Sequence, residues 1–117
     1  MENLRPTRAI INLDNVEHNF REIKRITKPD VKICAIVKAD GYGHGAIETA
    51  KMFLSCGAYY LAVAFLDEAI ELREKGIRAP ILILGFTPEH QFDKIVKYDI
   101  TQTVYNYKSC EYLSEIA

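Results

Sequence analysis

The sequence lacks the features that would point to a membrane, a nucleic acid or a secretory route. No apolar run in its 117 residues approaches the roughly 20 residues that cross a bilayer, and its first residues contain no secretory hydrophobic segment. The 15 lysines and arginines nearly balance the 16 aspartates and glutamates, so no global field would attract a polyanion. We therefore expect a cytoplasmic protein with small-molecule or protein partners, and no membrane or nucleic-acid partner.

Cysteine and histidine are too few and too scattered for a disulfide framework or a structural metal site. The three cysteines, Cys34, Cys56 and Cys110, are odd in number and far apart, which fits neither a disulfide framework nor a CxxC pair. The three histidines fall at no metal-ligand spacing. We expect the cysteines to be small buried side chains, and we expect no metal site.

What the sequence does contain is an alternation of apolar segments and amphipathic helices, which is typical of a parallel sheet with crossover helices. A short strand at Arg8–Leu13 is expected first, then a helix capped by Asp14 that ends at Pro29. Four core strands are predicted at residues 33–37, 61–65, 81–84 and 100–105. Because residues 33–37 are apolar throughout, we predict that this strand is covered on both faces.

The intervening helices have clear faces and ends. A helix should begin near Ala46, with Gly57 and Gly76 as C-terminal caps of this helix and the next. The pair Thr87-Pro88 is expected to open a further helix, with proline at its first position. The predicted buried positions of that helix and the last one are Phe92, Ile95, Val96, Cys110, Leu113 and Ile116.

These elements predict an α/β fold, a partial TIM-type (β/α) barrel. A complete barrel takes about 250 residues, so about four β/α units in 117 residues amount to the N-terminal half. We interpret residues 1–117 as a single truncated domain. Periodicity alone leaves one alternative open, a free-standing open sheet of four parallel strands.

Lys38 directly follows the first core strand, at the carboxyl end where parallel α/β folds place their active groups. Poor hydration after an apolar strand penalises the ammonium form of a lysine, and the neutral amine is the nucleophile that forms a Schiff base. The simpler interpretation is that Lys38 only marks the emergence of the strand into water.

The residues after Lys38 favour a phosphate ligand. Gly41, Gly43 and Gly45 would let the backbone approach a ligand, and the helix starting near Ala46 offers N–H groups to an anion. Tyr42 adds a phenolic donor beside Lys38.

A competing interpretation is a dinucleotide-binding loop, because residues 41–46 satisfy the pattern GxGxxA. The acid that should follow on the second strand, Asp67, instead comes after that strand's end. Lys38 and Asp40 would also crowd the tight turn, so we rank this interpretation below a lysine-bound phosphate cofactor.

The nine residues Val37–Gly45, VKADGYGHG, resemble the cofactor-lysine motif of the alanine racemases. Residues 62–69, 72–77 and 80–85 resemble the strands and helix that follow in that family. The resemblance extends from about Arg8 to the end and favours the half-barrel.

The resemblance implies a pyridoxal-phosphate (PLP) isomerase that interconverts L- and D-alanine and supplies D-alanine for peptidoglycan precursors. It implies that Lys38 binds PLP as a Schiff base and acts as the base on one face of the substrate Cα. Tyr42 would hydrogen-bond the cofactor phosphate, and Leu84 would line the barrel mouth near the cofactor. His44 would support the site, and Asp40 receives no role.

The same resemblance implies that further parts lie elsewhere. An arginine at the pyridine nitrogen, more phosphate ligands and an opposing tyrosine base would come from later strands and from a partner subunit's β-domain in a homodimer. We therefore expect the 117 residues alone to be inactive. Half a barrel also leaves sheet edges and apolar surface exposed, so we expect a homo-oligomer.

Two other functions remain open. The parent protein could be a non-catalytic PLP-binding barrel protein of the PLP-homeostasis type, or a racemase for another amino acid such as serine.

Overall fold

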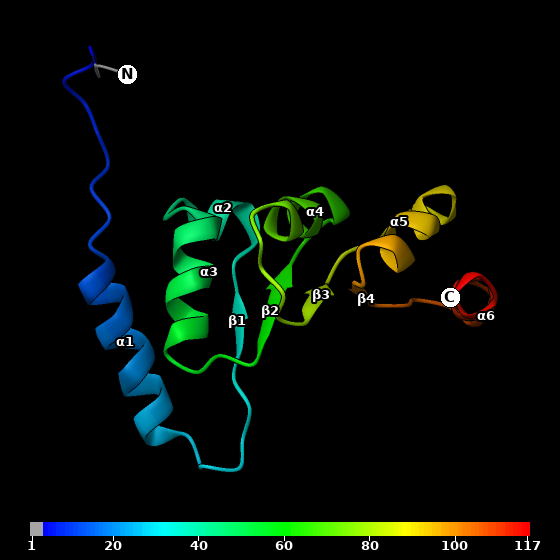
Figure 1. Cartoon of the computed structure of the whole chain (residues 1–117), viewed down its shortest axis with the longest axis horizontal. Helices are drawn as coiled ribbons and strands as arrows, with labels where there is room; N and C mark the ends of the chain where they lie inside the picture. Colours follow the sequence, from blue (N-terminus) through cyan, green and yellow to red (C-terminus); the bar gives the residue numbers. More distant parts are fainter. Residues whose placement is uncertain (1–3) are drawn as a thin grey trace.

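The computed structural model describes residues 4–117, which form one parallel sheet flanked by helices (Figure 1). The sheet has the sequential order β1-β2-β3-β4. In a doubly wound sheet the order of the strands reverses at the first strand, so that later strands are added on its other side. In a barrel wall, consecutive β/α units add their strands in sequential order. The bounds are β1 Cys34–Ile36, β2 Tyr60–Val63, β3 Ile81–Ile83 and β4 Thr101–Gln102.

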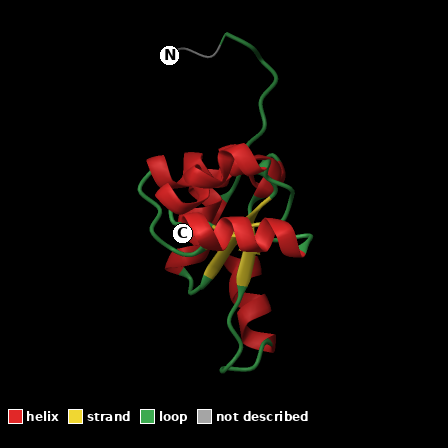
Figure 2. Cartoon of the chain, turned by 90° about the vertical axis from the view of Figure 1, so that its right-hand side faces the viewer, coloured by secondary structure: helices red, strands yellow, loops and turns green. Residues whose placement is uncertain are grey.

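Helices connect the strands in the order that the sequence predicts. They are α1 Leu13–Ile26, α2 Lys38–Tyr42, α3 Ala46–Ser55, α4 Leu66–Glu74, η1 Glu89–Gln91, α5 Phe92–Lys97 and α6 Tyr107–Ile116. Gly57 and Gly76 follow the ends of α3 and α4 with φ of 109° and 87°, the left-handed conformation expected of C-terminal caps. Figure 2 shows the short strands and the helices from the side.

The predicted strand at Arg8–Leu13 is wrong. Residues 8–12 form no strand, and Leu13 already belongs to α1. The segment is exposed and has no neighbouring strand to pair with. The helix cap is Asn12 rather than Asp14, since the Asn12 Oδ1 accepts hydrogen bonds from the Asp14 and Asn15 amides at 3.0 and 3.3 Å.

The core lies on the face of the sheet that the helices cover. Ala35 of β1 pairs with Leu61 of β2, which pairs with Ile81 of β3, so alternate residues along these strands share a face. That face contributes Ala35, Val37, Leu61, Val63, Ile81 and Ile83, all buried, against Ala50, Ala69, Leu72, Phe92 and Ile95 of the helices. This single apolar layer fixes the strands that carry the loops at their carboxyl ends.

Within residues 4–117 no helix covers the opposite face of the sheet, so the prediction that β1 is buried on both faces is wrong. Cys34 is exposed and Ile36 is 44% exposed, whereas Ala35 between them is buried. An apolar sequence indicates that a strand can be buried on both faces, but it does not reveal whether another layer covers each face. We call the surface of Cys34, Ile36, Leu82 and Leu84 the open face.

Two further predictions of burial are wrong. Only Cys56 is buried among the cysteines, because Cys34 lies on the open face and Cys110 on the outside of α6. Val96 is 40% exposed. The chain after Thr87-Pro88 first forms the 3-10 turn η1, so α5 begins only at Phe92. In the short α5, Phe92 and Ile95 contact the core instead.

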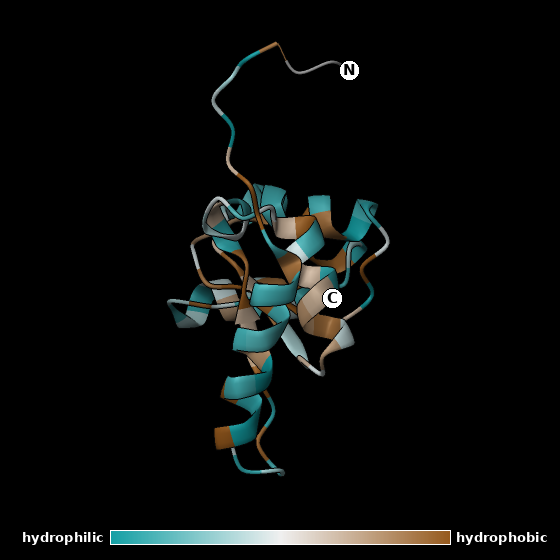
Figure 3. Ribbon diagram, turned by 90° about the vertical axis from the view of Figure 1, so that its left-hand side faces the viewer, coloured by the Kyte–Doolittle hydropathy of each residue, from teal (hydrophilic) through white to brown (hydrophobic). Residues whose placement is uncertain are grey.

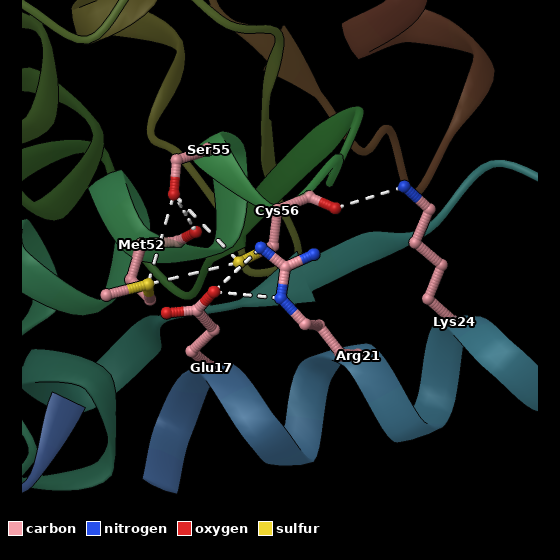
Figure 4. Close-up of polar contacts among 6 residues, drawn as sticks. All are labelled: Glu17, Arg21, Lys24, Met52, Ser55 and Cys56. Atoms are coloured by element: carbon pink, nitrogen blue, oxygen red, sulfur yellow. Dashed lines mark hydrogen bonds and ion pairs between the residues drawn. The ribbon is translucent and has the colours of Figure 1, made fainter. Parts of the chain in front are cut away.

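Helix α1 packs against α3 on the β1 side of the sheet (Figure 1). The Phe20 and Phe53 rings lie 5.5 Å apart, and the Lys24 amine donates to the Cys56 carbonyl at 3.1 Å (Figure 4). The face of α1 that points away from the sheet is hydrophilic (Figure 3). No helix within residues 4–117 is long and apolar enough to span a bilayer.

The amino end of the sheet is held by Arg73 of α4. Its guanidinium donates to the carbonyl oxygens of Ile77, Ala79, Tyr98 and Asp99 at 2.7–2.9 Å. Burial lowers the pKa of Arg73 below its usual range, because desolvation penalises the charged form. One side chain therefore joins the segments that lead into β3 and β4.

The open face predicts a distinct pattern of thiol labelling. Cys34 and Cys110 should react with a thiol reagent in the native chain, whereas Cys56, only 4% exposed, should react only after denaturation. Burial raises the pKa of Cys34, so less of its thiolate is present at neutral pH. The rate at which Cys34 reacts with the reagent should therefore increase as the pH rises. Peptide mapping assigns each site, with Cys34→Ser as the control. Native protection of Cys34 equal to that of Cys56 would show that the open face is covered in solution.

Candidate functional site

Lys38 begins α2 at the carboxyl end of β1 (Figure 1). The preceding residue, Val37, is buried, and its amide donates to the Ala62 carbonyl of β2 at 2.9 Å. Lys38 itself is half-buried, and its Nζ lies 5.8 Å from the centre of the Tyr42 ring. The structure thus brings together an amine and a phenol that the sequence predicted to be neighbours.

The segment after Lys38 is a tight left-handed turn, not the flexible glycine loop that the sequence suggested. Ala39, Asp40, Gly41 and Tyr42 have φ of 51°, 53°, 63° and 57°. A left-handed conformation costs about 1–2 kcal/mol for each residue with a side chain. Backbone strain of this kind clusters at active sites and ligand clamps, so the turn is a candidate functional segment.

Asp40, which received no role from the sequence, holds this turn together. Its Oδ1 accepts a hydrogen bond from the Ala46 amide at 2.8 Å, and its carbonyl accepts one from the Gly45 amide at 2.8 Å. The first amide of α3 is therefore occupied by a carboxylate of the chain itself. The Ala46 amide is therefore not free for the anion expected at the start of this helix.

His44 supports the same turn. Its Nδ1 lies 3.0 Å from the Gly41 carbonyl oxygen, within the turn, while the residue as a whole is exposed. This contact agrees with the supporting role expected for His44.

Tyr42 is 59% exposed and keeps its hydroxyl available to a ligand. Its ring and His44 form one end of an apolar groove of about 460 Å³ between α1, β1 and α3. The other lining residues are Val16, Asn19, Phe20, Ile23, Ile33, Ala35, Ile36, Gly41, Thr49 and Phe53.

Leu84 lies at the same edge of the sheet, just beyond β3. It is 38% exposed, and its carbonyl accepts a hydrogen bond from the Tyr105 hydroxyl. By strand alternation it shares the open face with Leu82. One strand, β2, lies between the strands that lead to Lys38 and Leu84, so Leu84 belongs to the rim and not to the Lys38–Tyr42 pair.

Glu68 is the residue at this edge that the sequence reasoning missed. Its Oε2 accepts from the Ala39 amide at 2.6 Å, and its Oε1 accepts from the Ala64 and Phe65 amides at 2.9 and 3.0 Å. The available signal was its place three residues after the helix N-cap, where glutamate typically binds the N-cap amide. The contact with Ala39, 29 residues away, could not be read from that signal.

The acidic residue that a dinucleotide-binding loop would need at the end of β2 is not found there. Asp67 lies in the first turn of α4, is exposed, and its Oδ1 accepts from the Glu68 amide at 2.9 Å. It therefore does not stand at the end of β2, where a ribose would require it. Among residues 4–117, no cluster of histidine, cysteine and acidic side chains could hold a metal ion.

Comparison with known proteins identifies the family. The family described as alanine racemase, N-terminal domain, matches residues 11–117. The chain belongs to the alanine racemase family. Alanine racemase 1 of Caldanaerobacter subterraneus subsp. tengcongensis is 52% identical over 114 residues, which are 97% of this chain and 29% of the relative.

Solved structures of the family agree with the fold. The alanine racemase of Clostridium difficile superposes with a TM-score of 0.93 at 47% identity, covering 98% of this chain and 30% of that one. The Bacillus anthracis alanine racemase with bound L-Ala-P superposes with a TM-score of 0.84 at 40% identity, covering 91% and 28%. The sheet and its helices are therefore a portion of a β/α barrel, as predicted, and the chain spans about three tenths of the length of these relatives.

Two glycines of the turn provide a matched test of its packing. Gly41 and Gly43 both have positive φ, so alanine is strained at each. A Cβ on Gly41 would also lie 2.9 Å from the Thr49 hydroxyl oxygen, whereas a Cβ on Gly43 would meet nothing within 4 Å. Gly41→Ala should lower the free energy of unfolding by about 1–3 kcal/mol more than Gly43→Ala, measured by urea denaturation. Equal losses would contradict the tight contact between the turn and α3.

Proposed function

We propose that the protein containing this chain is an alanine racemase that uses PLP and that Lys38 holds the cofactor. The observation that carries the proposal is the half-buried Lys38 at the carboxyl end of β1. Its amine lies 5.8 Å from the centre of the Tyr42 ring, and the strained turn follows it directly. The names of the relatives support alanine as the substrate and isomerisation as the reaction.

The residues present fit an aldehyde cofactor that carries a phosphate. Lys38 offers an amine at the carboxyl end of β1, and the neutral form of an amine condenses with an aldehyde. The exposed hydroxyl of Tyr42 offers a donor for a phosphate oxygen. When bound, PLP withdraws electrons from the Cα–H bond of the amino acid, which lowers the barrier to proton removal.

Lys38 would have a second task in the reaction. Its amine, held by the turn at the edge of the sheet, would take the proton from one face of the substrate Cα and return it there. Racemisation needs a proton donor on the opposite face as well. We propose that this second base lies outside the 117 residues and that they are inactive alone.

Leu84 and the open face would form part of the wall of this site. Apolar side chains at a barrel mouth exclude water and leave the cofactor's orientation to the few polar groups. Ile36 and Leu84, 44% and 38% exposed, supply such surface on β1 and β3. The uncovered face and the edges of β1 and β4 also support self-association of the chain into a homo-oligomer.

Replacing Lys38 tests the proposal directly. The 117-residue chain is mixed with PLP and treated with borohydride, which reduces a lysine-bound aldehyde to a stable adduct. We expect peptide mass mapping to find the adduct at Lys38 and to lose it in Lys38→Ala. Lys51→Ala removes an exposed lysine from α3 and should leave the adduct unchanged.

An adduct distributed over surface lysines and unaffected by Lys38→Ala would refute the proposed role. Chiral chromatography of L-alanine incubated with the same chain should detect no D-alanine. Lys38-dependent production of D-alanine would refute the proposal that the second base lies elsewhere.

Tyr42→Phe tests the phosphate contact separately. Loss of a hydrogen bond to a charged phosphate should weaken PLP binding about tenfold or more, measured by titrating the absorbance of the bound cofactor. The binding of pyridoxal, which lacks the phosphate, should change little. Tyr59→Phe, at another exposed tyrosine, is the control. An equal loss of affinity for PLP and pyridoxal would assign Tyr42 to the ring or the aldehyde instead.

A further inference from the structure

The carboxylate of Glu68 connects two carboxyl-end loops that carry the proposed site. One oxygen accepts from the Ala64 and Phe65 amides at the end of β2, and the other accepts from the Ala39 amide in the turn after β1. The first two amides belong to the short link between β2 and α4, two elements that are packed in the core, whereas the third belongs to the strained turn. Glu68 therefore anchors the turn to the rigid part of the fold.

The Ala39 amide matters because of where it lies. It belongs to the peptide plane that joins Lys38 to Ala39, so its direction fixes the backbone torsion ψ of Lys38. That torsion in turn sets the direction in which the Lys38 side chain leaves the backbone. At 2.6 Å the contact is as short as charge-assisted hydrogen bonds become.

Only glutamate meets the geometry of this bridge. Three donors converge on two oxygens, so both oxygens must be acceptors. In glutamine one of the two positions would be an NH₂ group facing an N–H donor. Aspartate keeps both acceptors but is one methylene shorter, so it cannot span from the β2 end to Ala39 without moving one of them.

We infer that Glu68 is a positioning residue for Lys38, which it serves by fixing the Lys38–Ala39 peptide. This inference rests on the proposed function, because it concerns the orientation of the amine that would hold the cofactor. Glu68 touches backbone amides only and is not assigned contact with substrate or cofactor.

The test compares Glu68→Gln with Glu71→Gln in the full chain. Both variants remove one carboxylate from α4, but Glu71 is exposed and lies one turn farther along. In Glu68→Gln we expect the Ala39 amide to exchange with solvent faster and its NMR resonance to shift, while Glu71→Gln changes neither. We also expect Glu68→Gln to weaken PLP binding about tenfold and to reduce the borohydride-trapped adduct at Lys38.

The outcomes separate this inference from the proposed function. If the unmodified chain shows no Lys38 adduct, the proposed function fails, and the exchange of the Ala39 amide still reports on the bridge. If the unmodified chain forms the adduct and Glu68→Gln binds PLP equally well, the inference is wrong and the proposed function stands. If Glu68→Gln does not fold, Glu68→Asp replaces it. That variant keeps the charge but not the span, and wild-type PLP affinity in it would overturn the inference.

Discussion

The left-handed turn after β1 is the constraint on which the proposed site depends. Three of its residues, Ala39, Asp40 and Tyr42, carry side chains in a conformation that costs each of them free energy. The turn persists because its polar groups are satisfied from three directions. Asp40 binds the first amide of α3, His44 contacts the Gly41 carbonyl, and Glu68 binds the Ala39 amide. Together these contacts give Lys38 a defined direction where a glycine-rich loop would leave it mobile.

The elements of the fold could be predicted from the sequence because local patterns determine them. The strand segments, the helix ends at Gly57 and Gly76, and the position of Lys38 all follow from hydrophobic alternation and cap chemistry over a few residues. The handedness of the turn could not be predicted in this way. The turn makes contacts with distant parts of the sequence: the Ala39 amide binds Glu68, 29 residues away, and Thr49 on α3 leaves no room for a side chain on Gly41.

Burial was mispredicted for a related reason. The apolar run of residues 33–37 indicates that its side chains suit a core, yet Cys34 and Ile36 are exposed because nothing in the described residues covers that face. The failed strand at Arg8–Leu13 has the same cause, since a strand needs a neighbour that the sequence of the segment itself does not reveal. Cys110 and Val96 show that a helical face is not a core position when the helix is short or peripheral.

Charge acts on this fold mainly through backbone groups. The ion pair Glu22–Arg25 is exposed on α1, whereas Glu17–Arg21 lies on the side of α1 that faces Cys56 (Figure 4). Ion pairs with this degree of exposure contribute about 0–1 kcal/mol. Arg73 and Glu68, both on α4, instead bind carbonyls at the amino end of the sheet and amides at its carboxyl end. A carbonyl or an amide is fixed by the fold, so a charged group that binds several of them fixes loops relative to one another. Since the carboxyl-end loops carry Lys38, Glu68 links the position of the lysine amine to the packed helix α4. Within residues 4–117 neither charged group forms a hydrogen bond with the open face, which stays available for packing against another layer.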